Sequence, residues 1–181
     1  MLRIALPNKG RLSQDARELF TDAGLEIRAA GPRALTASLG GEFQALFVRA
    51  QDIPEFVADG AADAGVTGFD LIQESGRALD ELADLEFGRC RLAVAVKEDS
   101  GIMTLDDIGN GMRVATVFPQ ITRRFFAERG ALVEVVPVSG AAERWPSHSA
   151  CCARRARCLA PRRARRVPAL APRRRERMAS R

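Results

Sequence analysis

The feature that most constrains the fold is a short apolar run that ends in a glycine turn flanked by cations. Leu2 to Leu6 is apolar apart from one arginine, which is typical of a buried strand. Lys9-Gly10-Arg11 follows it, and a helical pattern comes next. A strand, a glycine turn and a helix direct backbone N–H groups and the positive end of the helix dipole toward an anion. Two cations in the turn favour phosphate, although an ordinary turn with solvated cations explains the same residues equally well.

The same arrangement recurs along the chain and predicts an α/β fold with mixed, largely parallel sheets. Ala62 to Val66 has the composition of a buried strand, and Thr67-Gly68 separates it from another short helix. Gly40-Gly41 between two apolar runs predicts a hairpin, and Pro54 suits the first turn of a helix. In such folds ligands bind beyond the carboxyl ends of the strands, where these turns lie. We expect strands at 2–6, 25–28, 35–39, 43–48, 62–66, 90–96, 112–116 and 132–138, helices at 13–23, 54–59, 71–74 and 119–129, and a helical turn at 105–108.

Four residues have a structural explanation that needs no ligand. Ser13 is predicted to cap the first helix, and Asp52 to cap the helix that begins near Pro54. Asp63 suits a cap at a strand turn, and Cys90 lies in an apolar run, where a small core residue is expected.

The basic charge of the chain is confined to its last segment. Residues 144–181 contain 13 of the 28 basic residues and one of the 23 acidic residues, so residues 1–143 are acidic although the whole chain has a net charge of +5. No apolar run is as long as a membrane span, and the N-terminus lacks the pattern of a signal peptide. A cytoplasmic protein without a membrane partner is expected.

Six motifs occur in order along residues 1–143, and together they are far more specific than any one of them. They are Pro7-Asn8-Lys9-Gly10-Arg11-Leu12, Arg49-x-x-Asp52-Ile53-Pro54, Asp63-x-Gly65-Val66-Thr67-Gly68-x-Asp70, Phe87-Gly88-x-Cys90-x-Leu92, Ala115-Thr116-x-x-Pro119 and Gly140-Ala141-x-Glu143. Their order and spacing resemble the catalytic subunit of ATP phosphoribosyltransferase, and some details resemble its short form.

The resemblance implies a fold, an activity and partners. The fold would be that of the two-lobed periplasmic binding proteins, with a first lobe at 1–89 and an incomplete second lobe at 90–143. The activity would be that of a glycosyltransferase (a pentosyltransferase): it joins N1 of ATP to C1 of 5-phosphoribosyl 1-pyrophosphate, releases pyrophosphate and begins histidine biosynthesis. Mg²⁺ would bind with the substrate phosphates. The protein would be a homo-oligomer, which in the short form also needs a regulatory synthetase-like subunit, whereas the long form has its own C-terminal regulatory domain.

The resemblance also implies which residues bind the substrates. Lys9, Gly10 and Arg11 would contact nucleotide phosphates, and Arg49 would help to hold an anionic ligand. Asp70 and Glu143 would contact a ribose hydroxyl or water bound to Mg²⁺. The implied ATP- or phosphate-binding set is Lys9, Gly10, Arg11, Arg49, Thr67, Gly68, Asp70 and Glu143. No catalytic acid or base and no direct metal ligand is assigned, because displacement at C1 mainly needs cations, Mg²⁺ and N–H groups around the pyrophosphate.

The resemblance stops after Glu143. The family continues into an Asp-x-x-x-Ser/Thr-Gly-x-Thr-Leu loop that cradles 5-phosphoribosyl 1-pyrophosphate, and this sequence lacks that loop. Three explanations of residues 144–181 stay open: a frameshift in GC-rich coding sequence, a basic arm that binds nucleic acid, and a metal site. The four residues proposed for that metal site are His148, Cys151, Cys152 and Cys158. The segment contains few large apolar residues, so we expect it to be disordered. Because the loop is missing, we expect the chain as written to be inactive or nearly so.

Two other classes of function compete with the transferase. One is a small-molecule binding module of the periplasmic-binding type, because that fold is shared. The other is nucleic acid binding that depends on residues 144–181, although aromatic residues are almost absent there. Nucleic acid is therefore not an expected partner of the chain.

Overall fold

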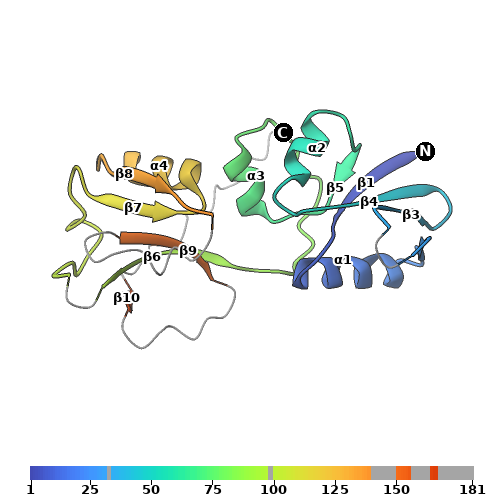
Figure 1. Ribbon diagram of the computed structural model, residues 1–181, viewed down its shortest axis with the longest axis horizontal. Coiled ribbons are helices and arrows are strands. Elements are labelled where there is room, and N and C mark those ends of the chain that lie inside the picture. Colours follow the sequence, from blue (N-terminus) through green and yellow to red (C-terminus); the bar gives the residue numbers. More distant parts are fainter. Residues whose placement is uncertain (32–33, 98–99, 140–149, 156–163, 167–181) are drawn as a thin grey trace, which may run out of the picture. The chain divides into compact units, whose positions relative to one another are not determined.

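The computed structural model describes residues 1–31, 34–97, 100–139, 150–155 and 164–166, and the chain divides into two compact units, Met1–Cys90 and Arg91–Arg181 (Figure 1). The first unit contains a five-stranded sheet with the strand order β2-β3-β4-β1-β5. Its strands are β1 (Leu2–Pro7), β2 (Ile27–Ala29), β3 (Thr36–Leu39), β4 (Phe43–Val48) and β5 (Ala64–Gly65). Its helices are α1 (Arg11–Asp22), α2 (Ile53–Ala58) and α3 (Phe69–Ser75).

The sheet of the first unit is antiparallel at one edge and parallel at the other. β3 pairs in antiparallel fashion with β2 and β4, and Gly40-Gly41 connects β3 to β4, so the expected hairpin is confirmed. β1 lies parallel to both β4 and β5, with Pro7 beside Val48 and Ala5 beside Gly65. The turns that follow β1, β4 and β5 therefore leave the same edge of the sheet.

Helices cover both faces of this sheet, because alternate residues of β1 point to opposite sides. Leu6 packs with Phe47 and with Phe20 of α1 in one apolar cluster. Ala5 packs with Ile53 and Phe56 of α2 in another. Figure 1 accordingly shows α1 and α2 on opposite sides of the strands. The apolar alternation of a single strand thus fixes where both helices lie.

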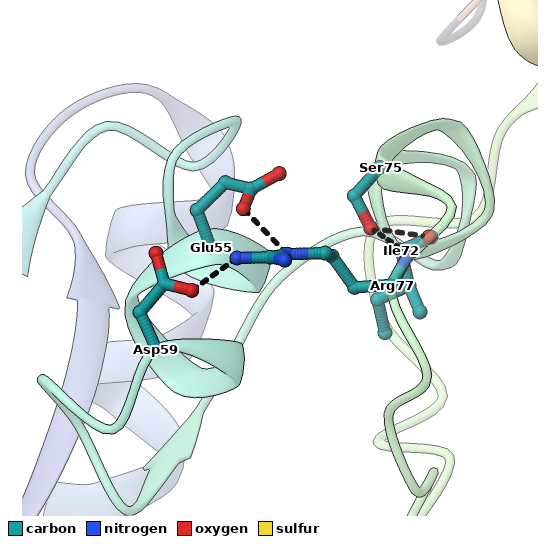
Figure 2. Close-up of polar contacts among 5 residues, drawn as sticks. All are labelled: Glu55, Asp59, Ile72, Ser75 and Arg77. Atoms are coloured by element: carbon teal, nitrogen blue, oxygen red, sulfur yellow. Dashed lines mark hydrogen bonds and ion pairs between the residues drawn. The ribbon is translucent and has the colours of Figure 1, made fainter.

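Close packing against β5 and ion pairs with Arg77 hold α2 at this edge of the sheet. Gly65 has no side chain, and a Cβ atom there would lie 2.5 Å from Cγ2 of Ile53, so α2 approaches β5 closely only because this residue is glycine. Arg77, which follows α3, forms ion pairs with Glu55 of α2, at 2.7 Å, and with Asp59, the residue that caps the carboxyl end of α2 (Figure 2). Arg77 therefore links the end of α3 to α2 and to its C-cap.

The second unit contains a mixed sheet with the strand order β10-β6-β9-β7-β8. Its elements are β6 (Arg91–Lys97), β7 (Arg113–Thr116), α4 (Pro119–Ala127), β8 (Glu134–Pro137), β9 (Ala150–Arg155) and β10 (Ala164–Arg166). β7 is parallel to β8 and β9, whereas β6 is antiparallel to β9 and β10. Phe126 of α4 packs in the core with Val94 and Val114. The prediction of an α/β fold with mixed sheets is confirmed.

The structure corrects two expectations. α1 begins at Arg11 with Gly10 at the N-cap position, so Ser13 is a residue of the first turn and not the cap. The turn expected at 105–108 is present, and the N–H of Ile108 donates to the carbonyl of Leu105 at 3.1 Å. Residues 144–181 were expected to be disordered, but the structure has two strands in this segment, β9 and β10.

The position of β9 explains why it forms. It lies between β6 and β7 and pairs with both, so its backbone groups are paired on both sides. The local sequence Ala150-Cys151-Cys152-Ala153 is small and apolar, which the composition of the whole segment conceals. The other residues of 144–181, which include His148 and Cys158 of the metal-site hypothesis, lie outside the described residues.

Candidate phosphate-binding site

Three of the implied binding turns leave the sheet of the first unit at one edge. Lys9-Gly10-Arg11 follows β1, Arg49 follows β4, and Thr67-Gly68 follows β5. The N–H of Asn8 donates to the carbonyl of Val48 at 2.8 Å, which holds the first two turns side by side. The carboxyl edge of parallel strands is the usual ligand-binding edge of an α/β sheet. The structure therefore brings together residues that are as far as 58 positions apart between Lys9 and Thr67.

The turn after β1 is shaped by glycine. Gly10 has φ 84° and ψ −178°, a conformation that residues with a side chain rarely adopt. It occupies the N-cap position of α1, and no side chain caps the helix there. Lys9, Gly10 and Arg11 are all exposed. Backbone N–H groups at the positive end of a helix dipole, together with two cations, are suited to hold a phosphate.

The turn after β5 is fastened to the turn after β4. The Thr67 hydroxyl donates to the carbonyl of Ala50 at 2.7 Å, and Ala50 is the neighbour of Arg49. Gly68 is the N-cap residue of α3, and its carbonyl accepts from the N–H of Leu71 at 2.9 Å. Thr67 therefore positions one turn against the other, whereas Arg49 is exposed at the same edge.

Asp70 is half-buried in the first turn of α3, next to an unexpected neighbour. Its Oδ1 accepts from the N–H of Leu71 at 3.1 Å, and the Cys90 thiol donates to its Oδ2 at 3.9 Å. Cys90 is exposed and precedes β6, so the expectation that it is a core residue is wrong. An apolar sequence around a cysteine does not reveal that the cysteine precedes the strand rather than lying within it.

Of the other three carboxylates that the sequence analysis singled out, two have structural roles and one is not described by the structure. Asp52 occupies the N-cap position of α2, as expected, but its side chain makes no capping hydrogen bond. Asp63 accepts from the backbone N–H of Arg3 at 2.7 Å, and this bond holds the pKa of its carboxyl below the usual value. Asp63 therefore fastens β5 to β1. Glu143 lies outside the described residues.

A groove of about 430 Å³ extends from the first turn along α1, and the sequence did not indicate it. Its lining residues are Lys9, Gly10, Ser13, Gln14, Arg17, Glu18, Thr21 and Asp22. The guanidinium of Arg17 stacks over the ring of Phe47, 4.3 Å from its centroid. Lys9 therefore lies at the amino end of the groove, Arg17 and Glu18 lie side by side along its middle, and Asp22 lies at its far end. Helical spacing from Gly10 would have placed Ser13, Gln14 and Arg17 near one another.

Two further observations bear on the class of the protein. Across the described ranges, no group of three or more His, Cys, Asp or Glu residues is arranged to hold a metal ion. In the same ranges, no helix is long and apolar enough to cross a membrane.

The fold and this site define an α/β protein with glycine turns at the carboxyl edge of its first sheet. Comparison with known proteins gives the family. The family model described as ATP phosphoribosyltransferase matches residues 49–151. Over 146 residues the chain is 72% identical to the ATP phosphoribosyltransferase of Gemmatimonas aurantiaca, covering 79% of this chain and 50% of that protein. Over 148 residues it is 49% identical to that of Methanosarcina mazei, covering 81% and 51%. The chain belongs to the ATP phosphoribosyltransferase family.

A solved structure supports the fold. The ATP phosphoribosyl transferase (HisG:HisZ) complex from Thermotoga maritima contains a chain that matches with a TM-score of 0.71 at 24% identity, covering 86% of this chain and 75% of that chain. The fold implied by the sequence resemblance is therefore confirmed. The chain spans about half the length of the curated relatives that it matches.

Proposed function

We propose that this chain carries the ATP-binding part of an ATP phosphoribosyltransferase, the enzyme that joins N1 of ATP to C1 of 5-phosphoribosyl 1-pyrophosphate, releases pyrophosphate and so begins histidine biosynthesis. The observation that carries the proposal is 72% identity to such an enzyme over 146 residues. The three turns at one edge of the first sheet support it, because they offer cations and N–H groups to phosphate. The relatives are enzymes of biosynthesis, and a cytoplasmic location stays a prediction.

The residues present suit displacement at the anomeric carbon. The reaction builds positive charge on the ribose and releases a highly charged leaving group, so electrostatic positioning contributes more than a strong acid or base. Lys9, Arg11 and the N–H groups at Gly10 would bind phosphate oxygens. Arg49 would hold an anionic ligand at the neighbouring turn, and Asp70 would contact a ribose hydroxyl or water bound to Mg²⁺.

Mg²⁺ would enter with the substrate phosphates. Mg²⁺ in nucleotide sites is held by one or two carboxylates, water and the phosphates themselves, so it needs no cluster of protein ligands. A single carboxylate such as Asp70 fits this requirement. When bound, Mg²⁺ would neutralise charge on the leaving pyrophosphate.

We propose further that the chain binds ATP but does not complete the reaction. The loop that cradles 5-phosphoribosyl 1-pyrophosphate in the family has no counterpart in this sequence, whereas the turns proposed for ATP are present. Reading the gene across the codons for Gly140 to Cys158 tests the frameshift explanation. Recovery of Asp-x-x-x-Ser/Thr-Gly-x-Thr-Leu in another frame supports it, and a gene that encodes the arginine-rich residues 144–181 in frame overturns it.

The assembly of the protein follows from the family proposal. A homo-oligomer is expected, and a regulatory synthetase-like subunit is expected if the chain represents the short form. The solved relative is a complex, which supports such a partner. Against this, the matched curated relatives are about twice as long as the segment that aligns. Sedimentation of the chain with and without such a subunit tests both expectations.

The two rival functions are not favoured. A periplasmic binding module has no reason to share six ordered motifs with a transferase. Nucleic acid binding would have to depend on residues 144–181, because residues 1–143 are acidic. Deleting 144–181 and measuring binding to a DNA duplex tests it, and a salt-dependent affinity that vanishes with the deletion would favour this rival.

Calorimetric titration of the full chain with ATP and Mg²⁺ tests the main proposal. We expect saturable binding, and about tenfold weaker binding for Lys9→Ala because a charge-assisted contact to phosphate is lost. Arg28→Ala, which removes an exposed cation on β2, is the matched control and should bind like the native chain. No ATP binding at millimolar concentration contradicts the proposal. Release of pyrophosphate from both substrates at about 1 s⁻¹ or faster contradicts the proposed inactivity.

A further inference from the structure

At the amino end of the α1 groove, the Ser13 side chain is buried and has no hydrogen-bond partner among the described residues. Ser13 is 7% exposed and lines this groove next to Lys9 and Gly10. Its backbone N–H donates to the carbonyl of Gly10 at 3.1 Å, but within the described residues no hydrogen bond involves its hydroxyl. A buried polar group without a partner is costly, and such groups usually have a functional explanation.

Other hydroxyls of the described structure show that this is unusual. The buried hydroxyl of Thr122 donates to that of Thr116 at 3.1 Å, and Thr116 also accepts from a backbone N–H. Thr21, on the same helix as Ser13, donates to the carbonyl of Arg17 at 2.9 Å. Of the three buried polar side chains in the described part of the chain, Ser13 is thus the one whose hydroxyl has no partner.

We propose that the Ser13 hydroxyl donates a hydrogen bond to a phosphoryl oxygen of the ligand that Lys9 and the backbone at Gly10 hold. The inference rests on the proposed function and adds a ligand-binding residue to it. The surroundings favour an anion there, because the positive end of the α1 dipole and the cation Lys9 lie at this end of the groove. The phosphate chain belongs either to ATP or to the pyrophosphate group of the other substrate.

Ser13→Ala tests the proposal in the full chain, with Ser38→Ala on β3 as the matched control. Titrations with Mg²⁺ and either ATP, inorganic pyrophosphate or adenosine separate the possible ligands. We expect Ser13→Ala to weaken the binding of the phosphate ligand by about tenfold or more, since a hydrogen bond to a charged acceptor is lost. The affinity for adenosine should not change. Weaker ATP binding assigns Ser13 to the nucleotide, and weaker pyrophosphate binding alone assigns it to the pyrophosphate group.

Stability measured without ligand provides a second test. If the Ser13 hydroxyl makes a hydrogen bond only with the ligand, its removal breaks no bond in the ligand-free protein. Ser13→Ala should then unfold at the same or a higher urea concentration than the native chain. A clear loss of stability would reveal an internal partner and overturn the proposal. Native-like binding of ATP and pyrophosphate by Ser13→Ala overturns it while the proposed function stands. If the native chain binds neither ligand, the proposed function fails as well.

Discussion

At the scale of single residues, the backbone of Gly10 shapes the candidate site. Its φ of 84° with extended ψ lies in a region that is essentially restricted to glycine, although no atom lies near a Cβ built there. We expect Gly10→Ala to lower the free energy of unfolding by about 1–3 kcal/mol through backbone strain alone, and to weaken ATP binding. Urea unfolding measures the first effect. Gly31→Ala, where φ is not positive and space is also open, should cost much less, and equal costs would contradict this explanation.

Asp63 predicts a specific acid sensitivity. The N–H of Arg3 donates to its carboxylate, so the pKa of Asp63 is lower in the folded than in the unfolded chain. A lowered pKa stabilises the fold above the unfolded pKa of about 4, and this stabilisation is lost as the pH falls through the folded pKa. Asp63→Asn should therefore be less stable at pH 7 and should lose less stability between pH 5 and pH 3. Urea unfolding at several pH values measures this, with Asp80→Asn as control, and parallel profiles would contradict it.

At the scale of elements, Arg77 links two helices through charge. Its guanidinium forms ion pairs with Glu55 of α2 and with Asp59 at the C-cap of that helix, so ordering one long side chain supports two ion pairs (Figure 2). Exposed pairs contribute up to about 1 kcal/mol. A double-mutant cycle of Arg77→Ala and Glu55→Ala should show a coupling of about 0.5–1 kcal/mol that falls with added salt.

The Arg28–Glu26 pair is the matched control for that cycle. It joins Arg28 of β2 to Glu26 two residues before it in the chain, and their side chains are 77% and 70% exposed, so its coupling should be smaller. Equal couplings would mean that Arg77 does not fasten α3 to α2. Since α3 begins next to Gly68, Arg77→Ala should also disturb the turn after β5, visible as faster amide exchange at Thr67 and Gly68.

At the scale of the whole molecule, the sequence predicted what local patterns determine. The apolar run of β1, the glycines of the hairpin and Pro54 at the start of α2 each act within a few residues, and these elements are confirmed. Partnerships across the chain were not predictable in the same way. The bond from Thr67 to Ala50 and the exposure of Cys90 depend on tertiary packing. Ser13 was predicted to be the cap because serine is a common capping residue. Gly10 takes the cap position through its backbone conformation, and no side chain signals that conformation in the sequence.

β9 is the clearest case of structure that arises from distant pairing, and it yields the last prediction. A chain that ends at Arg155 retains β9 between β6 and β7, whereas a chain that ends at Glu143 removes both strands paired with β6, namely β9 and β10. Unpaired backbone groups in a sheet are costly. We therefore expect amide exchange in 91–97 to become fast in the shorter chain and to stay slow in the longer one.

The first unit supplies the internal control for this comparison. The pairing of β1 with β4 and β5 involves only residues of Met1–Cys90, so amides in 2–7 and 43–48 should stay protected in both chains. Hydrogen exchange followed by mass spectrometry reads both units in one sample. Equal protection of 91–97 in the two chains would show that β6 does not depend on β9. Loss of protection in the shorter chain alone would show that residues beyond the family's motifs complete the second sheet.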